Sequence, residues 1–166
     1  MQLATTAAAA FWFLPFVAPI CLWAAWSDMK FMKIPNTSVI ALTSVFVVVG
    51  LIALPLPEYL WRLTHFLIVL AVGFLLNMLR LVGAGDAKFA AAMAPFVAWS
   101  DAPQMLLFFA AVVIAAFVTH RLFQRLPAFR RVTPEWQSWD NKDFPMGLAL
   151  GASLVFYLVM AAVHGN

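Results

Sequence analysis

The chain has 166 residues, of which 65% are hydrophobic and only 10% are charged. Soluble domains of this size carry about a quarter charged residues, and their surface helices keep a polar face. The composition therefore excludes an ordinary soluble protein and predicts an all-α bundle of helices surrounded by membrane lipid. The net charge of +3 does not indicate a nucleic-acid partner, because the ten Lys and Arg residues lie between apolar segments, where they orient membrane helices.

Residues that commonly bind metals are few and scattered. Cys21 is the only cysteine, so neither a disulfide framework nor a thiolate zinc site is expected. His65, His120 and His164 lie far apart along the chain, in or beside different apolar segments. We therefore expect no metal and no cofactor.

Six apolar segments follow one another along the chain. They cover residues 7–26, 37–54, 60–81, 87–99, 103–123 and 144–163. A helix needs about 20 mostly apolar residues to cross the hydrocarbon core of a bilayer. The fourth segment is short for a full crossing and contains Pro95, so we expect a tilted or partly inserted helix there. The prediction is a single domain over residues 1–166 with about six transmembrane helices.

Positive residues fall almost entirely on one side of this arrangement. The nine on that side are Lys30, Lys33, Arg80, Lys88, Arg121, Arg125, Arg130, Arg131 and Lys142. Arg62 alone lies on the other side, beside Glu58. Because cytoplasmic loops are enriched in Lys and Arg, we expect a multi-pass inner-membrane protein with both termini outside the cytoplasm. We expect residues 121–143 to lie at the cytoplasmic interface, anchored by Trp136 and Trp139.

Two of the seven acidic residues stand at the borders of apolar segments on this positive side. Asp28 ends the first segment, in WSDMKFMKIPN, and Asp86 begins the fourth, in LVGAGDAKFA. Carboxylates at a membrane border are costly and are functional candidates for that reason. Two carboxylates held close together cannot both ionise, so one keeps a proton while the other acts as a base. The pair is a candidate for the acid and base of a hydrolysis.

Taken together, these two segments resemble the prepilin peptidases of the GxGD aspartic class. The resemblance implies that Asp28 and Asp86 are the two catalytic aspartates. The residues that match the supporting motifs are Ile34, Pro35, Asn36, Gly83, Gly85, Lys88, Pro145 and Gly147. Met146 departs from the family, which has an aromatic residue between this proline and glycine.

The resemblance implies an aspartic endopeptidase that removes a short basic leader, ending in a small residue such as glycine, from type IV prepilin precursors. The chain lacks the cysteines of the bifunctional enzymes, which indicates the short, peptidase-only type associated with Flp pili and tight adherence. Archaeal preflagellin peptidases share the small size and remain an alternative. A different class is a non-enzymatic membrane protein, either a small proton-coupled carrier or an assembly subunit.

Several of these residues also have simpler structural interpretations. Asp28 can pair with Lys30 or Lys33 at the interface, and Asp86 can cap the helix that it begins. Lys88 can serve only to orient the chain in the membrane.

The remaining acids and the turn after Asp28 are expected to have structural roles at most. Pro35 ends one segment, and Asn36 is expected to cap the next helix. Glu58 and Asp101 lie on the far side from the aspartate pair, so we expect Glu58→Gln and Asp101→Asn to be near neutral for cleavage.

The helix ends predict how the two aspartates divide their roles. Asp28 lies near the C-terminal, partly negative end of one helix, whereas Asp86 lies at the N-terminal, partly positive end of another. This field places the proton on Asp28 and makes Asp86 the base.

Overall fold

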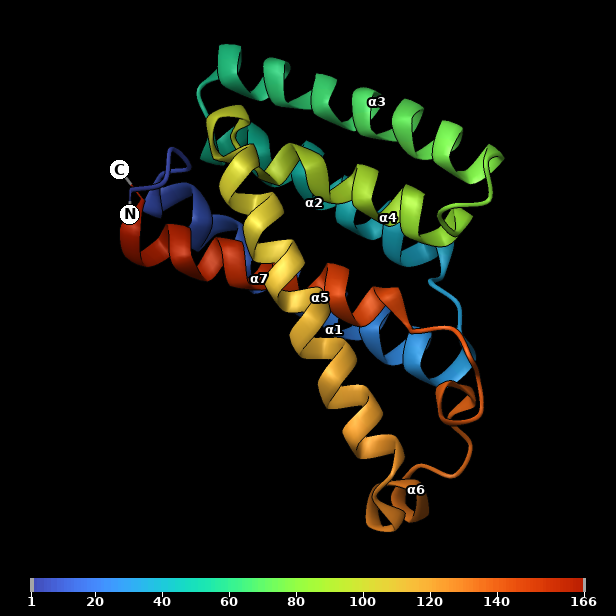
Figure 1. Ribbon diagram of the computed structural model, residues 1–166. Coiled ribbons are helices and arrows are strands. Elements are labelled where there is room, and N and C mark those ends of the chain that lie inside the picture. Colours follow the sequence, from blue (N-terminus) through green and yellow to red (C-terminus); the bar gives the residue numbers. More distant parts are fainter. Residues whose placement is uncertain (1, 166) are drawn as a thin grey trace.

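The computed structural model describes residues 2–165, and this part of the chain is all-α. The α-helices are α1 (Ala7–Phe31), α2 (Asn36–Ala53), α3 (Leu56–Met78), α4 (Ala84–Met93), α5 (Ala102–Gln124), α6 (Pro127–Val132) and α7 (Met146–His164). The predicted apolar segments overlap α1, α2, α3, α4, α5 and α7, although α1 continues five residues past its segment and α4 ends six residues before the end of its segment. The prediction of an all-α helix bundle is confirmed (Figure 1).

Five helices are long and apolar enough to cross a membrane, namely α1, α2, α3, α5 and α7. The fourth predicted segment differs, because α4 has only ten residues and is followed by a 3₁₀ turn that contains Pro95. Ten helical residues rise about 15 Å, which is half the thickness of the hydrocarbon core. The fourth segment therefore enters the bundle without a full helical crossing, as its length and Pro95 indicated.

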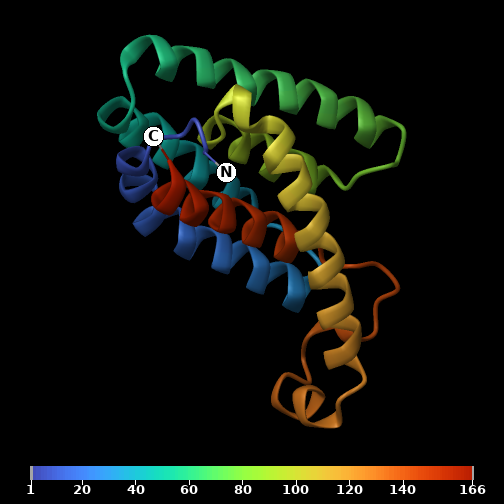
Figure 2. The ribbon, with the colours of Figure 1, turned by 60° about the vertical axis from the view of Figure 1, so that its left-hand side comes forward.

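The first and last long helices, α1 and α7, lie side by side in both views (Figures 1 and 2). Gly151 allows this close packing, because a Cβ atom at that position would lie 2.9 Å from the carbonyl oxygen of Cys21. Gly73 does the same between α3 and α4, where an added Cβ would lie 2.9 Å from Cβ of Ala87. Close contacts at small residues are the usual way in which membrane helices associate.

Both termini lie at one end of the bundle, where Leu3 pairs with Gly165 in an isolated β-bridge (Figure 1). The loops 32–35, 79–83 and 125–145 lie at the other end, so the chain alternates between the two ends as predicted. The nine positive residues lie on these loops and on the adjoining helix ends, whereas Arg62 lies toward the termini. Helix α5 runs obliquely across the bundle and carries α6 away from it (Figures 1 and 2).

The segment after α5 folds back on the protein through its tryptophans. Trp139 is buried, stacks on His120 with ring centroids 5.1 Å apart, and donates from Nε1 to the carbonyl oxygen of Thr133. Trp136 stacks on Trp139 at 5.6 Å. The prediction that Trp139 anchors this segment in lipid headgroups is therefore wrong, because its ring has an aromatic partner within the protein.

A buried polar network closes the end of the bundle that holds the termini. Asp101 is 2% exposed and accepts hydrogen bonds from the N–H groups of Ala4 and Thr5 and from the hydroxyl of Tyr157. Arg62 is 1% exposed and donates to Thr5 Oγ1.

Arg62 extends this network to two further elements. Its guanidinium binds Oε1 of Glu58 at 2.6 Å, one turn earlier on α3. It also donates to the carbonyl oxygen of Phe96 at 3.1 Å, after α4. Glu58 and Asp101, the two acids expected to be near neutral for cleavage, thus both belong to this structural network. No local motif predicts the bond between Asp101 and the N–H of Ala4, 97 positions away.

We predict that Asp101→Ala lowers the free energy of unfolding by about 3 kcal/mol, because it leaves several buried donors without an acceptor. Thermal unfolding of the detergent-solubilised protein, followed by tryptophan fluorescence, measures the change. Asp143→Ala, at an exposed position, is the matched control and leaves the midpoint unchanged. Equal midpoints for the Asp101→Ala and wild-type proteins would show that the network contributes no stability.

Candidate active site

Asp28 is bound by the first turn of the last helix. It lies in the last turn of α1, and its side chain is buried. Its Oδ2 atom accepts a hydrogen bond of 2.7 Å from the backbone N–H of Gly147. The first N–H groups of a helix have no partner within the helix and bind anions readily. The start of α7 therefore supplies a fixed donor to the Asp28 carboxylate.

Position 147 has no room for a side chain, because the Asp28 side chain lies against its Cα atom. A Cβ atom at this position would lie 2.9 Å from Cβ of Asp28, 3.1 Å from its Oδ2 and 3.1 Å from Cγ1 of Ile34. Pro145 precedes α7 as its N-cap residue and has no N–H of its own to place there. The motif residues Pro145 and Gly147 thus start the helix and position its first turn against Asp28.

Asp86 lies in the first turn of α4, whose N-cap residue is Gly83. The carboxylate turns back over that residue, because a Cβ atom at Gly83 would lie 2.6 Å from Oδ2 of Asp86. Burial and the negative charge of Asp28 raise the pKa of Asp86 to about 6, against a smaller lowering by the Gly83 N–H. The N-cap residue of α4 is thus Gly83 and not Asp86, which lies within the first turn and has a raised pKa.

Ile34 joins the two aspartate segments. Its side chain is buried, and it packs against Gly147 on one side. On the other side, a Cβ atom at Gly85 would meet Cβ of Ile34 at an ordinary contact distance of 3.5 Å. Asp28 contacts Gly147 and Asp86 follows Gly85, so the loop after α1 holds the two carboxylates at the same end of the bundle. Their electrostatic interaction shows the same proximity.

The remaining motif residues support this loop. Pro35 is the N-cap residue of α2, and its carbonyl oxygen accepts bonds from the N–H and the hydroxyl of Ser38. Asn36 is the first residue of the helix and makes no cap, so the prediction of Asn36 as the cap is wrong. Its Oδ1 atom lies 3.4 Å from Nζ of Lys88 instead, which connects α2 to α4.

Lys30, two residues after Asp28, has other partners. Lys30 forms an ion pair of 3.2 Å with Glu135 and lies over the ring of Trp26. Asp28 instead accepts its hydrogen bond from the Gly147 N–H. The ion pair between Lys30 and Glu135 attaches the segment after α5 to α1. Among residues 2–165, no group of three His, Cys, Asp or Glu side chains lies close enough to hold a metal ion.

The geometry changes the expected division of roles. Both aspartates, and not only Asp86, face the start of a helix, because the first turn of α7 lies against the Asp28 carboxylate. This third helix start is supplied by α7, which carries neither aspartate. The repulsion between the two carboxylates is mutual and favours a proton on either one, so the helix ends alone do not select Asp86 as the base.

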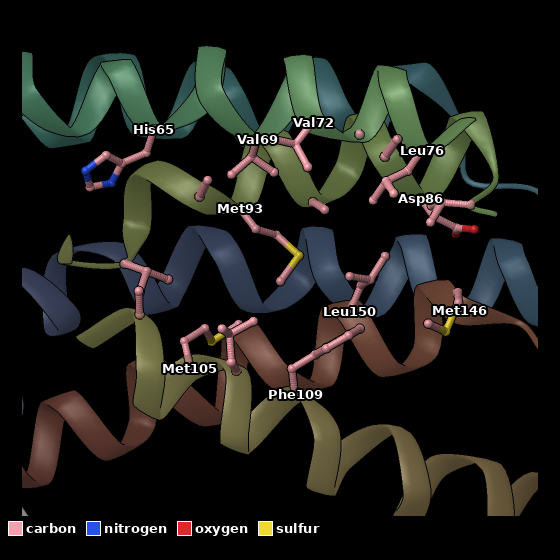
Figure 3. Close-up of a pocket in the computed structure, with 18 of the residues that line it drawn as sticks. His65, Val69, Val72, Leu76, Asp86, Met93, Met105, Phe109, Met146 and Leu150 are labelled. Atoms are coloured by element: carbon pink, nitrogen blue, oxygen red, sulfur yellow. The ribbon is translucent and has the colours of Figure 1, made fainter. Parts of the chain in front are cut away.

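A pocket of about 510 Å³ opens beside Asp86 (Figure 3). Its walls are apolar side chains of α3, α4, α5 and α7, including Val72, Met93 and Leu150. Asp86 and Met146 lie at one end (Figure 3). The arrangement is that of a membrane protein with a coupled pair of carboxylates at a helix-bundle end and an apolar pocket leading away from them.

Residues 15–120, more than half of the chain, match the type IV leader peptidase family. The chain therefore belongs to this family, the prepilin peptidases. The matched region contains Asp28 and Asp86 and ends before Pro145 and Gly147. Comparisons with curated proteins and with solved structures give no match.

We predict that Gly147→Ala reduces prepilin cleavage at least about tenfold, because the added methyl group displaces α7 from Asp28 and weakens a charge-assisted hydrogen bond. Initial rates with a purified precursor measure this effect. Gly50→Ala is the control, since Gly50 packs against the ring of Tyr59 and away from the aspartates. Equal rates for the Gly147→Ala and wild-type enzymes would mean that the contact between α7 and Asp28 is not needed.

Proposed function

We propose that this protein is an aspartic endopeptidase that removes the basic leader from type IV prepilin precursors of the Flp type, with Asp28 and Asp86 as its catalytic residues. The observation that carries the proposal is the coupled carboxylate pair, in which Asp28 is fixed by the Gly147 N–H and Asp86 has a raised pKa. Membership in the type IV leader peptidase family supports the same reaction.

In the proposed mechanism Asp28 is the base and Asp86 is the acid. The ionised Asp28 takes a proton from a water molecule, whose oxygen adds to the carbonyl carbon of the scissile bond. Asp86 donates its proton toward the carbonyl oxygen as negative charge develops there. The tetrahedral intermediate then collapses with cleavage of the C–N bond, and the leaving amine takes the proton held by Asp28. Asp86 recovers its proton from the re-forming carboxyl group of the leader.

The charge distribution supports both the proposed membrane orientation and a substrate with a basic leader. The nine positive residues lie at the aspartate end, which supports a cytoplasmic location for that end and an extracytoplasmic location for both termini. A basic leader also stays on the cytoplasmic side, while the apolar helix that follows it remains in the bilayer. The scissile bond then lies at the border where Asp28 and Asp86 are found.

The contacts between distant parts of the chain support a single peptidase domain over residues 1–166. Helices α1 and α7 pack along each other, and the Asp28–Gly147 bond joins positions 119 residues apart. A proton-coupled carrier is less well supported, because carriers bind at the bilayer midplane, whereas both aspartates lie at helix ends.

The assignment predicts that Asp28→Asn and Asp86→Asn each abolish cleavage, with a loss of about a thousandfold or more, because each removes one member of the acid and base pair. Co-expression with a prepilin and the mass shift of the processed product measure the loss. Asp143→Asn is the control at an exposed acid. Wild-type processing by either variant, at equal amounts in the membrane, would disprove the two-aspartate mechanism.

The pH dependence tests the roles of the two residues. Asp86 must be protonated to act as the acid, and its pKa is raised to about 6. The rate therefore falls as the pH rises through about 6, since Asp86 loses its proton. Single-turnover rates in detergent between pH 5 and pH 8 measure the profile. A His65→Gln variant should show the same fall in rate, which would exclude the His65 imidazole as the titrating group. A rate that increases over this range would contradict the assignment.

Topology reporters test the orientation. We predict that reporters fused after His164 are active outside the cytoplasm and that a reporter within residues 125–143 is active inside it, because of the distribution of Lys and Arg. A cytoplasmic signal from the C-terminal fusion would reverse the orientation and place the aspartates on the other side.

A further inference from the structure

The pocket beside Asp86 extends along the bundle to His65. His65 lies at the opposite end of the pocket from Asp86, with Val69, Val72 and Leu76 following it along α3 (Figure 3). Leu76, beside Asp86, is eleven residues after His65 in α3, which corresponds to about 16 Å along the helix. Between the two polar ends the pocket walls are apolar.

His65 is a buried polar group, and one of its ring nitrogens lacks a hydrogen-bond partner in the described part of the chain. The residue is 5% exposed, and its Nε2 atom has no hydrogen-bond partner among residues 2–165. The rings of Trp61 and Trp99 pack against the imidazole at 5.9 and 5.6 Å and fix its position. An ionisable side chain within a membrane helix is costly, and such residues usually bind a partner.

We propose that the pocket receives one face of the substrate's apolar helix, and that His65 binds a polar side chain of this helix about eleven residues after the scissile bond. This inference rests on the proposed function, because it takes Asp86 as the point at which the substrate is cut. The basic leader lies outside the bilayer, so the part of the substrate that extends from Asp86 into the pocket is the helix after the cleaved bond.

The spacing follows from helix geometry. A substrate helix that runs alongside α3 rises by the same 1.5 Å per residue, so the distance from Asp86 to His65 corresponds to about eleven of its residues. The apolar walls suit its Leu and Ala side chains. His65 supplies the only histidine in the pocket lining and can exchange a hydrogen bond with an amide or hydroxyl group of the substrate. A lipid acyl chain can also fill an apolar pocket, but it has no polar group that could form a hydrogen bond with Nε2 of His65.

A series of synthetic precursors tests this inference. Each has a basic leader that ends in glycine, followed by a helix of Leu and Ala that carries one Gln at position 5, 8, 11 or 14, or none. The full-length enzyme in detergent should cleave the precursor with Gln at position 11 with a KM about fivefold lower than the precursor without Gln, as expected for one hydrogen bond. The kcat should be similar for both.

Variants of the enzyme assign the preference to the imidazole. His65→Gln should keep the preference for position 11, and His65→Phe should lose it. His164→Phe, at an exposed histidine at the end of α7, is the control and should keep it.

Two results would overturn the inference. A wild-type enzyme with equal KM for all precursors would show that His65 does not contact the substrate helix, and lipid would then be the better occupant. A preference that persists in His65→Phe would assign it to another residue. A wild-type enzyme that cleaves none of the precursors would instead disprove the proposed function itself, which separates the two failures.

Discussion

The hydrogen bond from the Gly147 N–H to Asp28 is the interaction on which the site depends. It joins the last turn of α1 to the first turn of α7 and fixes one carboxylate at a helix start. The absence of a side chain at Gly147 allows this contact, and Ile34 fills the remaining space between α7 and Gly85. The position of Asp28 relative to Asp86 therefore follows from packing among three loops, without a direct bond between the two aspartates.

The opposite end of the bundle is held by polar contacts as well. The hydrophobic effect gives little reason for helices to associate within lipid, so packing and interhelical hydrogen bonds must do so. The network of Arg62 and Asp101 connects the N-terminal segment, α3, the turn before α5 and α7. The bundle is thus fixed at both ends, and the apolar pocket lies along the length between them.

Sequence reasoning predicted the features that depend on local pattern. Apolar length located the long helices to within a few residues, and Pro95 indicated the interruption after α4. The positions of Asp28 and Asp86 at segment borders placed them at the same end, because each crossing reverses the chain. These predictions require only the length of a helix and the thickness of a bilayer.

The features that sequence reasoning missed depend on contacts between distant residues. Asp101 binds the N–H of Ala4, 97 positions away, and no local motif indicates that pairing. Trp139 fits an interfacial anchor by composition, but the ring of His120 is its partner. The motif around Gly147 could be recognised in the sequence. Its contact with Asp28 could not be predicted without knowing where α7 lies. That contact gives Asp28 a helix start of its own, which the prediction from helix ends did not include.

Infrared spectroscopy of the carboxyl groups tests the coupling of Asp28 and Asp86 most directly. Isotope-edited difference spectra between pH 5 and pH 8 would follow the band of the protonated carboxyl group in the wild-type protein and in the two single Asn variants. We predict a band that disappears near pH 6 in the wild type and is missing in Asp86→Asn. In Asp28→Asn it titrates at lower pH, because the negative charge that raises the pKa of Asp86 is gone. An Asp86 band that titrates at the same pH with and without Asp28 would show that the two carboxylates are independent and would contradict the account.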